Sequence, residues 1–238
     1  MYLKNNEKKD QTLKNKLELL FKILDYYKLN DLTANHASIL SFDKKGFYIN
    51  KHKYLFNEIK ANNLKYVDLK EQYNSKYYEI NKAGFYIHKF LHNSIAKPGS
   101  ILHTHSINAV AISCLNEGFN EKLNQSSMRF FRRIKYFNYN GMVIDKKVAK
   151  ELCSQIQKDT KIIILKNHGA ILIARDIEEL FHLTFHFEKC SEIQLKLLNI
   201  KILNKVSDKI AKLTCDQHES FGKVGHMSWK ASLRILKK

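Results

Sequence analysis

The chain has 238 residues and a formal net charge of +18, from 41 Lys and Arg residues against 23 Asp and Glu residues. A chain of this length can bury enough surface in one large domain to fold without disulfides. The N-terminal segment is polar and has no hydrophobic signal core. No apolar run approaches the roughly 18 residues that span a membrane. We therefore expect a cytoplasmic protein with no membrane span, whose 4 dispersed cysteines are reduced core thiols.

The excess of basic residues raises the question of a nucleic-acid partner, but their distribution argues against one. They are spread along the whole chain, and the densest stretch, residues 129–135, is short. Lysine, asparagine and isoleucine are all abundant, which is typical of a compositional bias. We expect a solvated basic surface, or attraction of anionic substrates, rather than nucleic-acid binding.

Taken in chain order, the hydrophobic spacing predicts helices and strands in irregular alternation. Leu13, Leu17 and Leu24 recur at helical intervals within a helix over about 11–28. Further helices are expected from about 84, over 106–116 and 146–158, from 176 to about 199, and in the polar C-terminal segment. Strands are expected over 37–42, 47–49, 65–69, 76–80, 101–104, 161–166 and 170–174. This pattern predicts a layered α/β domain with helices packed against a central sheet.

Three histidines form the most informative pattern in the chain. His103 and His105 are separated by one residue at the end of a predicted strand, so both side chains project from the same face. His168 follows a buried-looking strand and precedes Gly169 in a turn. Three imidazoles with an open fourth position form a catalytic rather than a structural ligand set for zinc.

These residues and three other segments together resemble the class II aldolase/adducin family. The resemblance rests on 101–106, on 165–169, on Asp176 and Glu179 at the start of a long helix, on 81–85, and on the loop 29–36. It runs in the family's order over about residues 15–200. A lone pair of histidines is common by chance, whereas these motifs in combination are specific. We expect a single domain over 1–238, with that core and a helical extension over about 201–238.

The resemblance implies a three-layer α/β/α sandwich with a central mixed or antiparallel sheet, assembled into a homotetramer. It also implies zinc, or another divalent cation, held by His103, His105 and His168. Aldolases of the family act on small sugar phosphates or similar hydroxy-carbonyl compounds, where the cation stabilises a developing enediolate. The adducin head shares the fold but is a cytoskeletal scaffold.

Three positions depart from the aldolase pattern. Gly84 stands where the aldolases have a glutamate that serves as their acid/base, and glycine cannot transfer protons. Lys82 and Ala83 replace their phosphate-contacting serines, so the chain resembles the adducin-like branch. Two hypotheses stay open. One is a metal-dependent lyase with a different acid/base, and the other is a non-catalytic assembly module whose metal site is vestigial or structural.

Other polar residues have weaker claims to a role. Asn35 lies where the family loop contacts substrate, although a simple turn role is equally compatible. His36 is a surrogate base or a variable loop position, and Tyr139 is a proton donor or a packing aromatic. The pairs His88 and His92, and 182 and 186, have i, i+4 spacing and are expected on helix surfaces or partly buried, with a site role as the alternative for His88.

Overall fold

A computed structural model describes residues 2–200 and 204–237, the first four of them as backbone alone. Seven strands form one sheet in the order β3-β2-β1-β4-β7-β6-β5. All neighbouring strands are antiparallel except β5 and β6, which are parallel. The sheet is therefore mixed, as predicted. The strand bounds are β1 His36–Leu40, β2 Gly46–Ile49, β3 Lys65–Asp68, β4 Ser100–Thr104, β5 Ile134–Phe137, β6 Ile162–Leu165 and β7 Gly169–Ala174.

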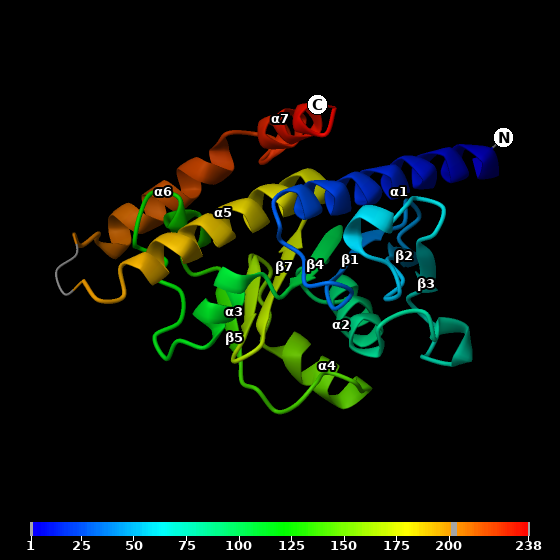
Figure 1. Cartoon of the computed structure of the whole chain (residues 1–238), viewed down its shortest axis with the longest axis horizontal. Coiled ribbons are helices and arrows are strands. Elements are labelled where there is room, and N and C mark those ends of the chain that lie inside the picture. The colour runs from blue at the N-terminus through cyan, green and yellow to red at the C-terminus, as the bar shows by residue number, and fades with distance from the viewer. Residues whose placement is uncertain (1, 201–203, 238) are drawn as a thin grey trace.

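Both faces of the sheet are buried. Successive side chains on each strand point to opposite faces, and each set packs into an apolar cluster of its own. On β7, Leu172 packs into one apolar cluster and Ile171 and Ile173 into another. The first cluster includes residues of α1 (Tyr2–Tyr26), α3 (Ile107–Ser113), α5 (Ile177–Lys196) and α7 (His226–Ile235). The second includes residues of α2 (Lys82–His92) and α4 (Lys146–Ser154). Figure 1 shows these two helical layers on opposite sides of the sheet, which confirms the three-layer α/β/α sandwich.

Several helices begin where a local side chain satisfies one of their first free amides. Asp176 accepts a hydrogen bond from the Glu179 amide at the start of α5, as the predicted capping spacing requires. The Glu179 carboxylate accepts from the Arg175 amide instead of returning to the cap residue, so the reciprocal half of a capping box is shifted by one position. The Asp145 and Asn81 side chains cap α4 and α2 in the same way.

Three features of the secondary structure differ from the prediction. Residues 76–80 form no strand, because the Asn74 side chain accepts from the Lys76 amide and starts a 3₁₀ turn over Ser75–Tyr77. Strand β5 was missed, since only its end residues are buried and it pairs with a strand that lies far along the chain. The first helix begins at Tyr2, well before the predicted start.

The C-terminal segment is helical but is not a separate appendage. Helix α6 (Asp208–Ser220) packs near the 3₁₀ turn Ser127–Phe130, and α7 packs on α5, where Trp229 joins the core. Residues 201–203 and 238 of the predicted extension lie outside the described residues. Cys190 and Cys215 are buried as expected, whereas Cys114 is exposed. In the part of the chain that the structure describes, no helix is long and apolar enough to cross a membrane.

Candidate metal centre

The end of β4 carries two of the three histidines toward the α2 side of the sheet. Leu102 packs on the α5 side, so Ile101 and His103 face α2, and His105 follows beyond the strand end. Strand β1 lies beside β4 in a register that pairs His36 with His103. The two imidazoles are tilted against each other with ring centroids 4.8 Å apart.

His168 reaches the same place through the tight turn between β6 and β7. The His168 amide donates to Ser113 Oγ at 3.1 Å, and the Asn167 amide donates to the Ser113 carbonyl at 3.0 Å, which ties the turn to α3. Gly169 has φ +151°, and a Cβ there would lie 2.5 Å from the Thr104 carbonyl oxygen. Only glycine allows the turn to approach the end of β4 this closely.

The three imidazoles converge through their Nε2 atoms. Nε2 of His105 lies 2.8 Å from Nε2 of His103 and 2.9 Å from Nε2 of His168. One ligating atom from each ring falls within 4.8 Å of the others. His103 is buried, while the other two rings are partly open to the cavity. The structure thus brings together the three residues proposed as metal ligands.

The outer nitrogens of two rings are committed to hydrogen bonds that set their tautomers. His103 donates from Nδ1 to the Ala170 carbonyl at 3.1 Å, and His105 donates from Nδ1 to the Asp31 carboxylate at 3.0 Å. A carbonyl or an ionised carboxylate can only accept, so both Nδ1 atoms carry the proton. In a neutral ring of this tautomer, the Nε2 atom that faces the cluster carries a lone pair.

This donor set fits a divalent cation. Burial lowers the pKa of His168, and burial with the neighbouring imidazoles lowers the pKa of His103 well below its usual value. Both rings are neutral near pH 7, as metal ligands must be. Lone pairs less than 3 Å apart repel each other unless a positive charge lies between them. The hydrogen bonds from His105 to Asp31 and from His103 to the Ala170 carbonyl are of the kind that orient metal-binding histidines.

The cluster opens into a cavity of about 520 Å³. Its walls include Asn81, Lys82 and His52, together with the three clustered histidines and His36. Among the other predicted site residues, Tyr139 lies at the edge of His168 with ring centroids 6.5 Å apart. Asn35 is fully buried, and neither polar atom of its side chain has a partner among the described residues.

The histidine pair on α2 was expected on a surface or partly buried, and this was wrong. His88 and His92 are buried against the sheet face that carries His36 and Ser38. The pair on α5 is partly buried, as expected. There His182 contacts Arg129, a cation, and no third metal ligand lies in reach within the described residues.

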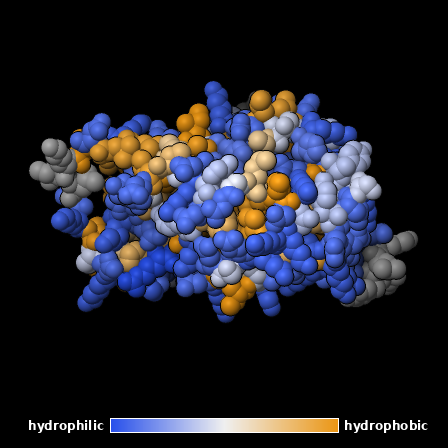
Figure 2. Space-filling view, turned by 90° about the horizontal axis from the view of Figure 1, so that it is seen from below, coloured by the Kyte–Doolittle hydropathy of each residue, from blue (hydrophilic) through white to orange (hydrophobic). Residues whose placement is uncertain are grey.

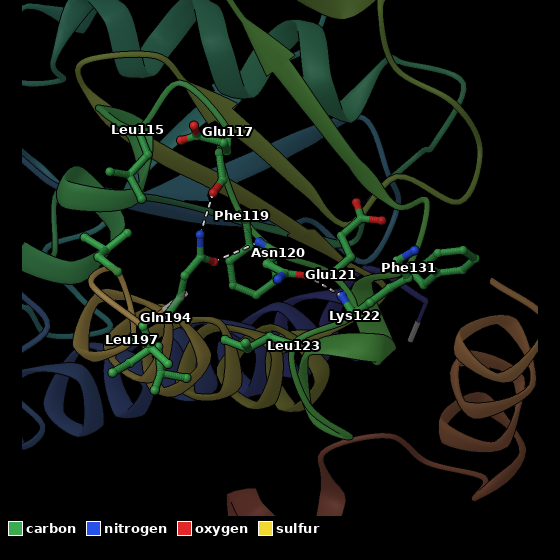
Figure 3. Close-up of a pocket in the computed structure, with 13 residues that line it drawn as sticks. Leu115, Glu117, Phe119, Asn120, Glu121, Lys122, Leu123, Phe131, Gln194 and Leu197 are labelled. Carbon is green, nitrogen blue, oxygen red and sulfur yellow. Dashed lines mark hydrogen bonds between the residues drawn. The ribbon is translucent and has the colours of Figure 1, made fainter. Parts of the chain in front are cut away.

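A second cavity, of about 560 Å³, lies between the segment that follows α3 and the end of α5 (Figure 3). Gln194 crosses it: its amide donates to the Gly118 carbonyl, and its carbonyl accepts from the Asn120 amide, both at 2.7 Å. Leu115 and Leu197 supply part of its apolar wall. None of the clustered histidines lines this cavity, so its volume alone does not indicate a catalytic or metal site.

Comparison with known proteins identifies the family. The family model for the class II aldolase and adducin N-terminal domain matches residues 15–195. This chain belongs to the class II aldolase and adducin family. An adducin-related protein of Schizosaccharomyces pombe is 30% identical over 249 residues, which cover 95% of this chain and 75% of that protein.

Solved structures agree with the class II aldolase fold. An aldolase II superfamily protein from Pseudomonas syringae superposes with a TM-score of 0.85 at 24% identity, covering 96% of this chain and 93% of that one. L-fuculose 1-phosphate aldolase from Glaciozyma antarctica has a TM-score of 0.79 at 19% identity, with coverages of 95% and 89%. The predictions of the family and of its fold are therefore confirmed.

In this class II aldolase/adducin family member, two groups of residues around the cluster were not predicted from the sequence. Asp31 lies in the quoted loop but was not singled out as a partner of His105. Ser38 and the α2 histidines were not connected to His36, although alternate residues on a strand and i, i+4 residues on a helix share a face. These two periodicities are the sequence signal that groups Ser38 with His36 and His88 with His92.

Proposed function

We propose that this protein is a metal-dependent lyase of the class II aldolase type, acting on a small sugar phosphate or hydroxy-carbonyl compound. The convergence of three imidazoles through their Nε2 atoms carries the proposal. His103, His105 and His168 would hold zinc or another divalent cation, which when bound supplies a Lewis acid for a substrate carbonyl oxygen. A cavity of about 520 Å³ beside the cluster suits a small ligand.

Residues in and around the cavity would bind and orient that ligand. Lys82 lines the cavity with its ammonium 5.8 Å from the centroid of the Tyr73 ring, and it can attract a phosphate or carboxylate group. Asn35 does not line the cavity itself, but its chain neighbours Ala34 and His36 do, and its buried side-chain amide has no partner in the described chain, which supports its assignment as a substrate contact. Asp31 and the Ala170 carbonyl hold two imidazoles in place.

Gly84 leaves the acid/base of this reaction to another residue. His36 and Tyr139 are the proposed candidates, since His36 lines the cavity and Tyr139 borders His168. His36 is buried next to His103, whereas the Tyr139 ring is exposed. Water has freer access to Tyr139, so its phenol contributes less to a site from which solvent is excluded.

Metal analysis and a substrate screen test the proposal. We expect purified protein to hold stoichiometric zinc, and His105→Ala to lose it while keeping its helical circular dichroism. Phosphorylated ketoses and aldol donors are then screened with the metal-loaded protein and with His105→Ala as the control. Zinc below stoichiometry with no rescue by added metal, or activity unchanged in His105→Ala, would overturn the lyase.

A second candidate function is a non-catalytic adducin-like module for assembly. Gly84 and the adducin-related protein at 30% identity support it. It predicts partner binding that is insensitive to His105→Ala and no turnover with any substrate of the screen. An intact cluster of three ligand-type imidazoles favours the lyase, because a scaffold needs no open metal site.

We further propose a cytoplasmic homotetramer with its subunit contacts near the cavity. Three apolar side chains on the segments that build the site are exposed: Leu32 next to Asp31, Ile107 shortly after His105, and Met142 on the cavity wall. A contiguous exposed apolar patch is typical of a contact surface between subunits. Light scattering coupled to size-exclusion chromatography tests the assembly, and a monomer at micromolar concentration would contradict it.

A further inference from the structure

Four buried polar side chains form a continuous chain between the metal cluster and the start of β4. His92 Nδ1 lies 2.9 Å from the Pro98 carbonyl oxygen, and His92 Nε2 lies 2.8 Å from Ser38 Oγ. Ser38 Oγ lies 2.5 Å from His88 Nδ1, and His88 Nε2 lies 2.7 Å from His36 Nδ1. None of these side chains is more than 4% exposed. The proposed metal chemistry makes no use of His88, Ser38 or His92.

The direction of every hydrogen bond in this chain follows from its last member. The Pro98 carbonyl can only accept, so His92 Nδ1 carries a proton and donates. In a neutral His92 the Nε2 atom then accepts from the Ser38 hydroxyl. Ser38 Oγ in turn accepts from His88 Nδ1, which leaves His88 Nε2 to accept from His36 Nδ1.

The opposite direction would place a charge in the core. If Ser38 accepted from His92 Nε2 while Nδ1 still donated to Pro98, the His92 ring would carry both protons. Burial lowers the pKa of His92 to about 4, so the doubly protonated ring is disfavoured near pH 7. The phenyl ring of Phe47, 5.0 Å away between centroids, adds an apolar wall on this side.

His36 stands at the cavity end of the chain. It lines the cavity, and its Nε2 atom has no hydrogen-bond partner among the described residues. A Cβ on Gly84 would lie 3.1 Å from His36 Cδ2 and 3.3 Å from Nε2, so the ring occupies the space next to the glycine. Any larger residue at 84 would press on this ring. His36 and Gly84 therefore form a matched pair beside His103.

We propose that Pro98, His92, Ser38 and His88 form a hydrogen-bond relay that holds His36 in the Nδ1–H tautomer, with its Nε2 lone pair presented to the cavity as an acceptor for a ligand hydroxyl. The relay members other than His36 are positioning residues, since none of them lines the cavity. An acceptor beside three ligand-type imidazoles selects hydroxylated carbonyl compounds over carbonyl compounds without a hydroxyl. The choice of ligand rests on the proposed function, whereas the tautomer does not.

Long-range ¹H–¹⁵N spectra of ¹⁵N-histidine-labelled full-length protein read each tautomer directly. We expect Nδ1–H for His36, His88 and His92, with and without zinc. Ser38→Ala interrupts the relay and should give His36 a mixture of Nδ1–H and Nε2–H forms, whereas Ser38→Thr, which keeps the hydroxyl, should not. An Nε2–H tautomer of His36 in the wild type, or an unchanged tautomer in Ser38→Ala, overturns the relay. If Ser38→Ala does not fold, His92→Phe interrupts the same chain, because a phenyl ring can neither donate to the Pro98 carbonyl nor accept from Ser38.

The ligand part of the proposal is tested with dihydroxyacetone and acetone as probes of the zinc-loaded protein. We expect dihydroxyacetone, but not acetone, to move the His36 Nε2 signal. Loss of the acceptor in His36→Phe should weaken dihydroxyacetone binding by about threefold to tenfold. A His36 signal that stays unchanged at saturating dihydroxyacetone, or equal responses to both probes, overturns the role of His36 as the acceptor for a ligand hydroxyl. If the protein bound no zinc, the proposed function would fail, while the tautomers of the metal-free protein would still decide the relay.

Discussion

At the scale of single residues, Asp31 is the contact of the cluster that is easiest to alter without touching a ligand. Its carboxylate accepts from His105 Nδ1 at 3.0 Å and keeps Nε2 as the inward lone pair. We expect Asp31→Asn to weaken zinc binding by about tenfold, the lower end of the range for outer-shell partners, because half of the Asp31 side chain is exposed.

Competition titration with a chromophoric zinc chelator measures this change. Asp25→Asn is the matched control, since Asp25 accepts from Asn30 in the same region and does not contact the clustered histidines. Equal zinc affinity in Asp31→Asn and wild type would mean that Asp31 does not orient His105.

At the scale of elements, the turn between β6 and β7 holds His168 by backbone geometry. We expect Gly169→Ala to lower both stability and zinc affinity, because the new methyl group would meet the Thr104 carbonyl at 2.5 Å and the residue has φ +151°. The loss of stability should be about 1–3 kcal/mol by urea unfolding. Gly141→Ala, where a Cβ meets nothing within 4 Å, is the control for positive φ alone. Equal effects of the two substitutions would rule out the close approach of strands as the cause.

A buried ion-pair network fixes the start of α5 on the sheet. The Glu179 carboxylate is 1% exposed and accepts from Lys161 at 2.7 Å and from Arg175 at 3.0 Å. Glu179→Gln leaves the partly buried Lys161 ammonium without its counter-charge, so we expect a loss of about 3 kcal/mol in the free energy of unfolding, the lower end of the range for a broken buried pair. Glu192→Gln on the same helix removes a more exposed carboxylate and should cost at most about 1 kcal/mol. Similar losses in both variants would contradict the role of burial.

How far the sequence predicts each element depends on how local its signal is. The two histidines on β4 and the one before Gly169 could be found because strand periodicity and a glycine turn are properties of short segments. Periodicity could place His88 and His92 on one helix face, but the contact of His88 with His36 arises only when α2 packs across β1. Strand β5 was missed for a similar reason, because its parallel pairing with β6 joins residues 134–137 to 162–165.

At the scale of the whole molecule, charge and core composition have separate consequences. The face in Figure 2 is mostly hydrophilic, with apolar side chains in smaller groups, which is how a surface with a net charge of +18 stays hydrated. The core instead contains histidines that must be neutral, among them His88 and His92. The surface charge affects association and its salt dependence, whereas the core histidines make folding depend on pH.

We therefore expect the free energy of unfolding to fall as pH decreases from about 6.5 to 4. Burial lowers the pKa of folded His92 to about 4, while an unfolded histidine titrates near 6.5. Between these values the unfolded chain binds more protons, so the stabilisation is complete above about pH 6.5 and is lost as pH falls through the folded pKa. The His92 shift alone corresponds to about 3 kcal/mol.

Urea unfolding of the wild type and His92→Gln at several pH values between 7 and 4 tests this linkage. The glutamine keeps a side-chain amide that can donate to the Pro98 carbonyl but does not titrate. His92→Gln should be less stable near pH 7, because it changes a buried hydrogen-bonded chain. Its stability should then fall about 3 kcal/mol less than that of the wild type over this window. Parallel pH profiles would show that His92 is not a buried neutral histidine, and the direction of hydrogen bonding derived from it would no longer hold.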